Sequence, residues 1–193
     1  MRAALKLDAP AVLVAHSYGA MTALAYAEQY PAEVKALVLI APICMPEPRF
    51  VEHTYLAPRA FPVWGPWMSQ TMGAMDHAFF DVVTHLMFAP RRVPDTWRTR
   101  IERARIISAD AMVSEGEDAS AIAPLNPSAH LQLTRIDCPI VVIIGDQDCI
   151  VRNEHQGLAL AALKRAVVLR VPHTGHMTHE CAPHVVLEAV AQI

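Results

Sequence analysis

Three groups of residues that could perform acid–base chemistry each follow a short β-rich run of this sequence. Ser17 comes after AVLVA, two aspartates end the stretch VVIIGDQD, and three histidines follow AVVLRV. A serine hydroxyl is a poor nucleophile until a base removes its proton, and a histidine base needs an acid that orients it. A serine, an acid and a histidine in this chain order therefore indicate nucleophilic catalysis.

The stretch LVAHSYGA, residues 13–20, favours a tight turn from a strand into a helix around Ser17. Such a turn lifts the hydroxyl above a sheet and points the N-terminus of the next helix at the reacting centre. It is expected to need small residues two positions before and after the serine, which here are Ala15 and Gly19. A serine that only caps the helix would fit this stretch as well, so both roles stay open at this point.

Four apolar runs predict strands buried on both faces, as in a parallel sheet. They lie at 11–15, 34–40, 139–145 and 166–171. Helical patterns lie between or after them, at 20–30, 155–164 and 183–193. Strands that alternate with helices indicate an α/β architecture with right-handed crossovers. Sites in such sheets form beyond the carboxyl ends of the strands, so the serine, aspartates and histidines are expected at one edge.

The segment 43–135 interrupts this alternation. It holds every Phe and Trp of the chain, is rich in Pro and Met, and contains two predicted helices, 76–88 and 95–109. We interpret it as a helical insertion between the second and third strands. The predicted domains are an α/β core and a helical cap, at 1–42 with 136–193 and at 43–135.

With these features, the chain resembles the C-terminal two thirds of a serine α/β-hydrolase, in which nucleophile turn, acid turn and histidine loop follow in this order. The family motif G-x-S-x-G corresponds to AHSYG at 15–19, with alanine in the first position. The resemblance covers the whole chain. It implies the α/β-hydrolase fold, a mostly parallel sheet with a helical cap or lid where 43–135 is inserted.

The same resemblance implies that the first strands of the family, and the second oxyanion donor they carry, are absent from this chain. We therefore expect an N-terminally incomplete hydrolase. Its strand at 11–15 would then be an exposed, apolar edge that invites self-association and poor solubility.

The resemblance also assigns roles to individual residues. Ser17 matches the nucleophile, and the Gly-His pair that the family carries selects His176 as the base. The acid motif fits GDQD and selects Asp148, with Asp146 as the runner-up. The backbone N–H of Tyr18 would be one donor of the oxyanion hole.

A metal site is an alternative to this triad, because His173, His176 and His179 are closely spaced. Zinc-hydrolase histidines usually lie on a helix, as in H-E-x-x-H, or come with a carboxylate ligand. Here a glycine and the end of a strand interrupt them. We therefore expect no metal and no cofactor, and we expect His173 and His179 to be loop or surface residues.

The resemblance implies a hydrolase that cleaves a carboxylic ester through an acyl-enzyme. Relatives that cleave haloalkanes or epoxides use aspartate at the nucleophile position, so Ser17 argues against those activities. Three alternatives stay open: an acyltransferase, a C–C bond hydrolase with the same triad, and an inactive pseudo-hydrolase that only binds a ligand or partner.

The cap is expected to face an apolar acyl or alcohol group, because it is rich in aromatic and Met residues. The same side chains could equally form the cap's own core. The residues predicted to bind substrate are His16, Trp64, Trp67 and Phe80. The arginines between positions 91 and 105 are expected to form a solvated helix face.

Composition limits the partners. The formal net charge of −3 gives no reason to expect a nucleic acid or an anionic membrane, so a small-molecule ester is the expected partner. No apolar run reaches the ~18 residues of a membrane span, and we expect no stable membrane insertion. The 4 cysteines form no C-x-x-C pair, which favours reduced thiols and a cytoplasmic location.

Overall fold

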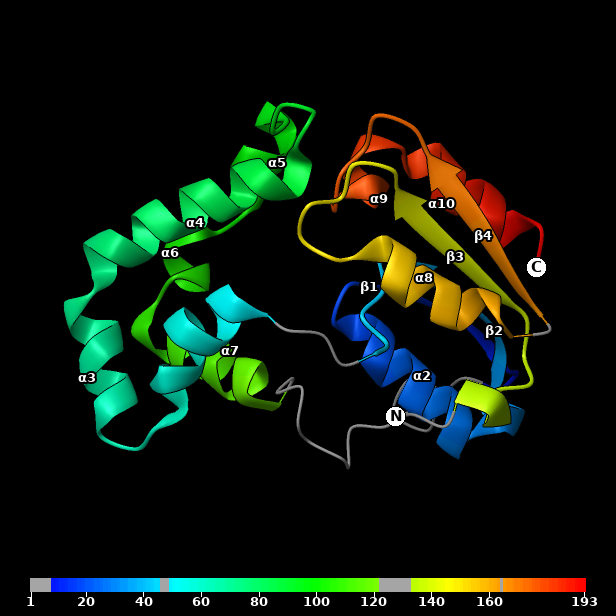
Figure 1. The fold of residues 1–193 in the computed structure, drawn as a ribbon, viewed down its shortest axis with the longest axis horizontal. Helices are drawn as coiled ribbons and strands as arrows, with labels where there is room; N and C mark the ends of the chain where they lie inside the picture. The colour runs from blue at the N-terminus through cyan, green and yellow to red at the C-terminus, as the bar shows by residue number, and fades with distance from the viewer. Residues whose placement is uncertain (1–7, 46–48, 122–132, 164) are drawn as a thin grey trace. The chain divides into compact units, whose positions relative to one another are not determined.

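The computed structural model describes residues 8–45, 49–121, 133–163 and 165–193. The chain divides into two compact units, a core unit and a helical unit (Figure 1). The core unit comprises Met1–Met45, Leu86–Arg92 and Leu131–Ile193. The helical unit comprises Pro46–His85 and Val93–His130.

A four-stranded parallel sheet forms the centre of the core unit. Its strands lie in sequence order, β1 (Ala11–His16), β2 (Val34–Ile40), β3 (Ile140–Gly145) and β4 (Ala166–Val171). The prediction of an α/β architecture with a parallel sheet is thus confirmed. Within the described residues β1 is an edge strand, and Val14 on it is 50% exposed.

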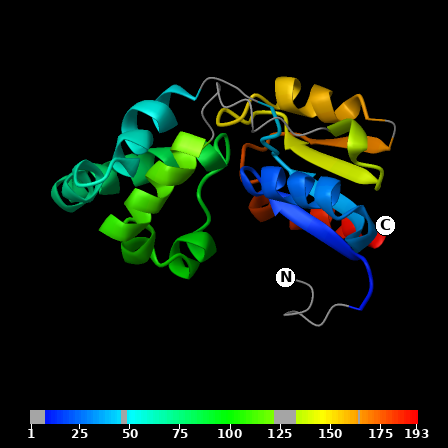
Figure 2. The ribbon, with the colours of Figure 1, turned by 90° about the horizontal axis from the view of Figure 1, so that it is seen from below.

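Each face of the sheet carries its own hydrophobic cluster, because successive side chains of a strand point to opposite sides. On β2, Leu37 and Leu39 pack into one hydrophobic cluster, while Val38 and Ile40 pack into another. Helices α2 and α8 supply the first cluster, and α10 supplies the second (Figure 2). The bounds of these helices are Gly19–Gln29, Asn153–Ala161 and Pro183–Ala191.

The register of the strands brings their carboxyl ends to one edge of the sheet. His16 pairs with Ile40, and Ile40 pairs with Ile143. Gly145 pairs with Val171. The loops that follow β1, β3 and β4 therefore start close together, as the parallel arrangement predicts.

The helical unit and the segments around it contain five α-helices in the described residues. They are α3 (Trp64–Thr71), α4 (Gly73–Phe88), α5 (Asp95–Arg100), α6 (Arg103–Ile106) and α7 (Ala109–Ala121). Two short irregular helical turns precede them, at Glu52–Leu56 and Ala57–Ala60. No helix that the structure describes is long and apolar enough to cross a membrane.

The prediction of one helix over 95–109 was wrong. Ile101 has extended backbone angles, φ −82° and ψ 133°, and it separates α5 from α6. The next helix, α7, begins only at Ala109 and was not predicted.

The segment Leu86–Arg92 belongs to the core unit, although the chain on both sides of it belongs to the helical unit. The sequence prediction had placed this whole stretch in the insertion. Phe88 is fully buried, and the carbonyl of Met87 accepts a hydrogen bond from the N–H of Met177 at 3.1 Å. The end of α4 is therefore part of the structure that surrounds the loop after β4.

Candidate active site

Ser17 lies in a strained turn between β1 and α2. Its φ of 53° is in the left-handed region, which costs a non-glycine residue about 1–3 kcal/mol. Three backbone hydrogen bonds hold it there. Its N–H donates to the carbonyl of Ile40 at 2.9 Å, and its carbonyl accepts from the N–H groups of Ala20 and Ile43, both at 3.1 Å. The end of β2 thus fixes the direction of the serine side chain.

The expected crowding at Gly19 is absent, and that part of the turn prediction was wrong. A Cβ on Gly19 would meet no described atom within 4 Å. The close approaches lie between the other loops instead. A Cβ on Gly145 would lie 2.3 Å from the carbonyl oxygen of Thr174, and one on Gly175 would lie 2.1 Å from that of Ala89. Glycine is therefore required where the loops after α4, β3 and β4 meet.

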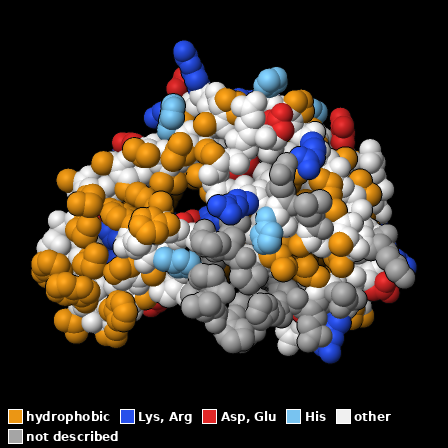
Figure 3. All heavy atoms as spheres, in the orientation of Figure 1, with side chains coloured by type: hydrophobic (Ala, Val, Ile, Leu, Met, Phe, Trp, Pro, Cys, Tyr) orange, Lys and Arg blue, Asp and Glu red, His pale blue; other side chains and the backbone are white. Residues whose placement is uncertain are grey.

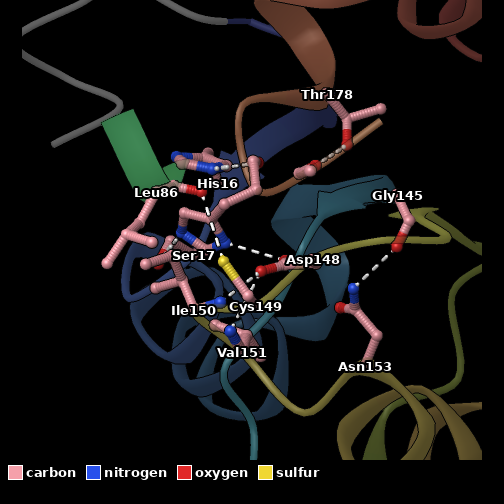
Figure 4. A network of polar contacts seen from close by, with 12 residues as sticks. His16, Ser17, Leu86, Gly145, Asp148, Cys149, Ile150, Val151, Asn153 and Thr178 are labelled. Carbon is pink, nitrogen blue, oxygen red and sulfur yellow. Dashed lines mark hydrogen bonds and ion pairs between the residues drawn. The ribbon is translucent and has the colours of Figure 1, made fainter. Parts of the chain in front are cut away.

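One imidazole joins the serine to the acid (Figure 4). Nε2 of His176 lies 2.9 Å from Oγ of Ser17, and Nδ1 of His176 lies 2.9 Å from Oδ2 of Asp148. A carboxylate only accepts hydrogen bonds, so Nδ1 carries the proton and Nε2 accepts from the hydroxyl. The His176 side chain is 2% exposed, and that of Asp148 is fully buried.

The carboxylate of Asp148 has three donors. Oδ1 accepts the N–H groups of Ile150 at 2.8 Å and Val151 at 3.0 Å, while Oδ2 faces His176. Burial by itself raises the pKa of Asp148, but the hydrogen bond and charge of His176, with the two backbone donors, lower it, and the net direction is down. The group is therefore ionised and able to orient the imidazole.

Asp146, the runner-up acid, has a different place. It is exposed, and its Oδ1 accepts the backbone N–H of Thr174 at 3.3 Å. It therefore supports the start of the histidine loop, whereas Asp148 contacts the imidazole.

His16 lies against the same loop. Its Nε2–H donates to the backbone carbonyl of His176 at 3.1 Å, and its ring lies 4.6 Å from the ring of His176 and 4.4 Å from that of His179. Burial, reinforced by the neighbouring charges of His176 and His179, lowers the pKa of His16 from 6.5 to about 3. His16 is therefore a neutral donor, and its predicted contact with substrate stays a prediction.

Tyr18 is the residue at the N-terminal cap of α2. Its backbone N–H lies at the positive end of a helix and next to Ser17 in the chain. Such a position suits an oxyanion donor, which is the role that the sequence predicts for it.

The predicted substrate residues Trp64, Trp67 and Phe80 all belong to the helical unit. The two indoles stack with centroids 4.9 Å apart and are 57% and 54% exposed. Phe80 is half-buried, with the guanidinium of Arg103 5.4 Å from its ring centroid. Hydrophobic side chains gather on the surface of this unit (Figure 3). A substrate role for these residues stays a prediction.

The other two histidines have separate places. His173 is exposed, and its Nδ1 lies 3.3 Å from Nε2 of Gln147. His179 lies in the short helix α9 (Thr178–Cys181) and is half-buried against His16, so the expectation of a loop or surface position was wrong for it. Among the described residues, no three His, Cys, Asp or Glu side chains are grouped so that they could hold a metal ion.

Comparison with known proteins fits this geometry. A family model for the alpha/beta hydrolase fold matches residues 1–183. The chain belongs to the alpha/beta hydrolase fold family. No curated protein matches it.

Solved structures of hydrolases share the fold at low sequence identity. An alpha/beta hydrolase fold protein from Burkholderia ambifaria is 21% identical, with a TM-score of 0.69 over 100% of this chain and 68% of its own. A thermophilic esterase from Thermogutta terrifontis is 18% identical, with a TM-score of 0.63 over 99% and 66%. A haloalkane dehalogenase from Agrobacterium tumefaciens is 15% identical, with a TM-score of 0.71 over 98% and 67%. The chain spans about two thirds of their lengths.

Sequence reasoning missed the contribution of Leu86–Arg92 to the site. Arg91, expected on a solvated helix face, lies in the turn after α4 and donates to carbonyls of the histidine loop. No sequence signal could identify this role, because carbonyl acceptors are present at every position of a chain.

Acidification should destabilise this protein partly through His16. Its folded-state pKa of about 3 lies below the ordinary 6.5, so between these values the unfolded chain binds a proton that the folded chain does not. The penalty is absent above pH 6.5 and grows as the pH falls, by up to about 1.4 kcal/mol per pH unit. This penalty is measured by urea unfolding of the unmodified protein and of His16→Gln at several pH values between about 3 and 6.5. Equal pH slopes for the two proteins would contradict the assignment.

Proposed function

We propose that this protein is a serine hydrolase that cleaves a carboxylic ester through an acyl-enzyme. The observation that carries the proposal is the hydrogen-bond chain from Ser17 through His176 to Asp148, with 2.9 Å at both steps. A nucleophile within hydrogen-bonding reach of a base, which is itself oriented by a third group, is the geometry that nucleophilic catalysis needs.

The reaction proceeds in two halves. In the first, Nε2 of His176 takes the hydroxyl proton while Oγ of Ser17 bonds to the carbonyl carbon, and the imidazolium then gives this proton to the departing alcohol. In the second, a water molecule loses a proton to Nε2 and attacks the acyl-enzyme, and the same proton returns to Oγ as the acid leaves. Asp148 holds the imidazole in the required tautomer and stabilises its charged form throughout.

Negative charge that develops on the carbonyl oxygen needs donors that are already in place. The backbone N–H of Tyr18, at the N-terminus of α2, is the donor that we propose. One such donor is worth about 3–4 kcal/mol of the barrier.

The nucleophile type favours acyl substrates over haloalkanes, although a haloalkane dehalogenase is among the structures with the same fold. A serine that displaced a halide from carbon would be left as an ether, which has no carbonyl for water to attack. Dehalogenation therefore needs a carboxylate nucleophile, and this chain carries Ser17 in that position.

We propose that the acyl group or the alcohol group of the ester substrate is apolar. The support is the exposed hydrophobic side chains of Trp64 and Trp67, together with the half-buried Phe80. His16 is proposed as a further contact, because it lies directly beside the nucleophile in the chain. Self-association through the edge of β1 and a cytoplasmic location stay predictions.

The nucleophile is tested by covalent labelling. A fluorophosphonate probe should add its mass to the intact protein once, and Ser17→Ala should abolish both this labelling and the hydrolysis of p-nitrophenyl esters. Ser114→Ala, which changes an exposed serine of α7, is the matched control and should label like the unmodified protein. Labelling that persists in Ser17→Ala, or none in the unmodified protein, would refute the proposal.

The acid is tested by a pair of neighbouring substitutions. Asp148→Asn should lower kcat/KM by about 10³–10⁴-fold, because the amide NH₂ would face Nδ1 of His176, donate to it, and favour the tautomer that carries its proton on Nε2. Asp146→Asn keeps a carbonyl oxygen that can accept the N–H of Thr174 and removes only an exposed charge, so it should stay within about threefold of the unmodified protein. Similar losses in the two variants would show that the acid is wrongly assigned.

Substrate preference is tested with p-nitrophenyl esters from acetate to octanoate. We expect kcat/KM to rise with acyl length, by up to about 15-fold per two buried methylenes, because each contributes about 0.8 kcal/mol. Trp67→Ala should flatten this series, whereas Leu187→Ala, at an exposed position of α10, should not. A flat series in the unmodified protein would contradict the apolar site.

A further inference from the structure

The loop that carries His176 is held from outside by the segment Leu86–Arg92. This segment contains the end of α4 and the turn after it, and it belongs to the core unit. It contacts the loop by side-chain hydrogen bonds, by a backbone hydrogen bond and by close packing. The contacted residues of the loop all lie within five residues of His176 in the chain.

Arg91 makes the side-chain contacts. Its Nε–H donates to the carbonyl of His173 at 2.9 Å, and its Nη1–H donates to the carbonyl of Cys181 at 3.0 Å. The first acceptor precedes His176 by three residues, and the second follows it by five. One guanidinium thus joins the two ends of the loop, on either side of the imidazole.

The backbone of the same segment reinforces this arrangement. The N–H of Met177 donates to the carbonyl of Met87 at 3.1 Å. A Cβ on Gly175 would lie 2.1 Å from the carbonyl oxygen of Ala89, so the two backbones already touch. The residues directly before and after His176 are therefore both fixed by this segment.

The loop that carries the acid is attached to the segment as well. Sγ of Cys149 donates to the carbonyl of Leu86 at 3.3 Å, and Cys149 directly follows Asp148 (Figure 4). The segment therefore contacts the loop of His176, which transfers the proton, and also the loop of Asp148, which orients His176.

The loop needs such support. His173 has a φ of 50°, in the left-handed region that a non-glycine residue adopts only when its surroundings hold it there. A planar guanidinium suits the task, because it presents several donors in a rigid fork, whereas a lysine ammonium is a single point on a flexible chain.

We propose that Arg91 is a positioning residue of the active site, which holds Nε2 of His176 toward Ser17 by joining the carbonyls of His173 and Cys181. This inference rests on the proposed serine hydrolase. A displacement of about 1 Å at a reacting group can reduce turnover by about 100-fold, so loss of this support should be visible in the rate.

The test compares Arg91→Met and Arg91→Lys with Arg92→Met, which removes the same charge from the exposed neighbouring arginine. We expect both Arg91 variants to lower the rate of fluorophosphonate labelling and kcat by 10–100-fold, with KM within about twofold. Ethylguanidinium added to Arg91→Ala should restore part of the lost rate. Arg92→Met should match the unmodified protein.

Hydrogen exchange gives a second readout that needs no activity. The amides of residues 173–181 should exchange faster in Arg91→Met than in Arg92→Met, while amides of β2 should be unchanged. The inference would be overturned if both Arg91 variants had the same labelling rate, the same kcat and the same hydrogen exchange as Arg92→Met. If the unmodified protein does not label, the proposed function fails, and the exchange measurement still decides whether Arg91 holds the loop.

Discussion

The buried carboxylate of Asp148 is the constraint on which the arrangement of this site depends. A charge that is withdrawn from water must be matched by hydrogen bonds, because an unpaired buried ion costs several kcal/mol. Two backbone N–H groups serve one of its oxygens, and Nδ1–H of His176 serves the other. The hydrogen bond that satisfies the second carboxylate oxygen therefore also fixes the orientation of the imidazole. Its other nitrogen is left as an acceptor, and that acceptor faces Ser17.

The fold meets this constraint by bringing loops from three strands to one edge of a parallel sheet. Ser17, Asp148 and His176 each come from the loop after a different strand, β1, β3 and β4. The sheet register aligns the strand ends, and β2 holds the strained backbone of Ser17 through its last carbonyl. Tight packing is required not at the serine turn but between the loops after α4, β3 and β4, where Gly145 and Gly175 leave no room for a side chain.

Much of this could be predicted from the sequence, because the signals are local. Apolar runs mark buried strands, and the order of Ser17, Asp148 and His176 follows the order of the strand ends. The features that sequence reasoning missed depend on distant partners. The extended backbone of Ile101 divides an expected helix without any Gly or Pro to mark it. Arg91 reaches carbonyls 82 and 90 residues away. The neutral state of His16 depends on burial among other histidines.

The path of the chain gives the helical unit an unusual connection to the core. A simple insertion leaves the core once and returns once, whereas this chain changes unit after Met45, His85, Arg92 and His130. The additional passage is Leu86–Arg92, which contacts the loops of both the acid and the base. The helical unit has its own buried ion pair, in which Arg59 and Asp76 lie 2.5 Å apart and are at most 1% exposed. The short passage Leu86–Arg92, by contrast, exchanges hydrogen bonds with the loops of His176 and Asp148, so it belongs to the site and not to the helical unit.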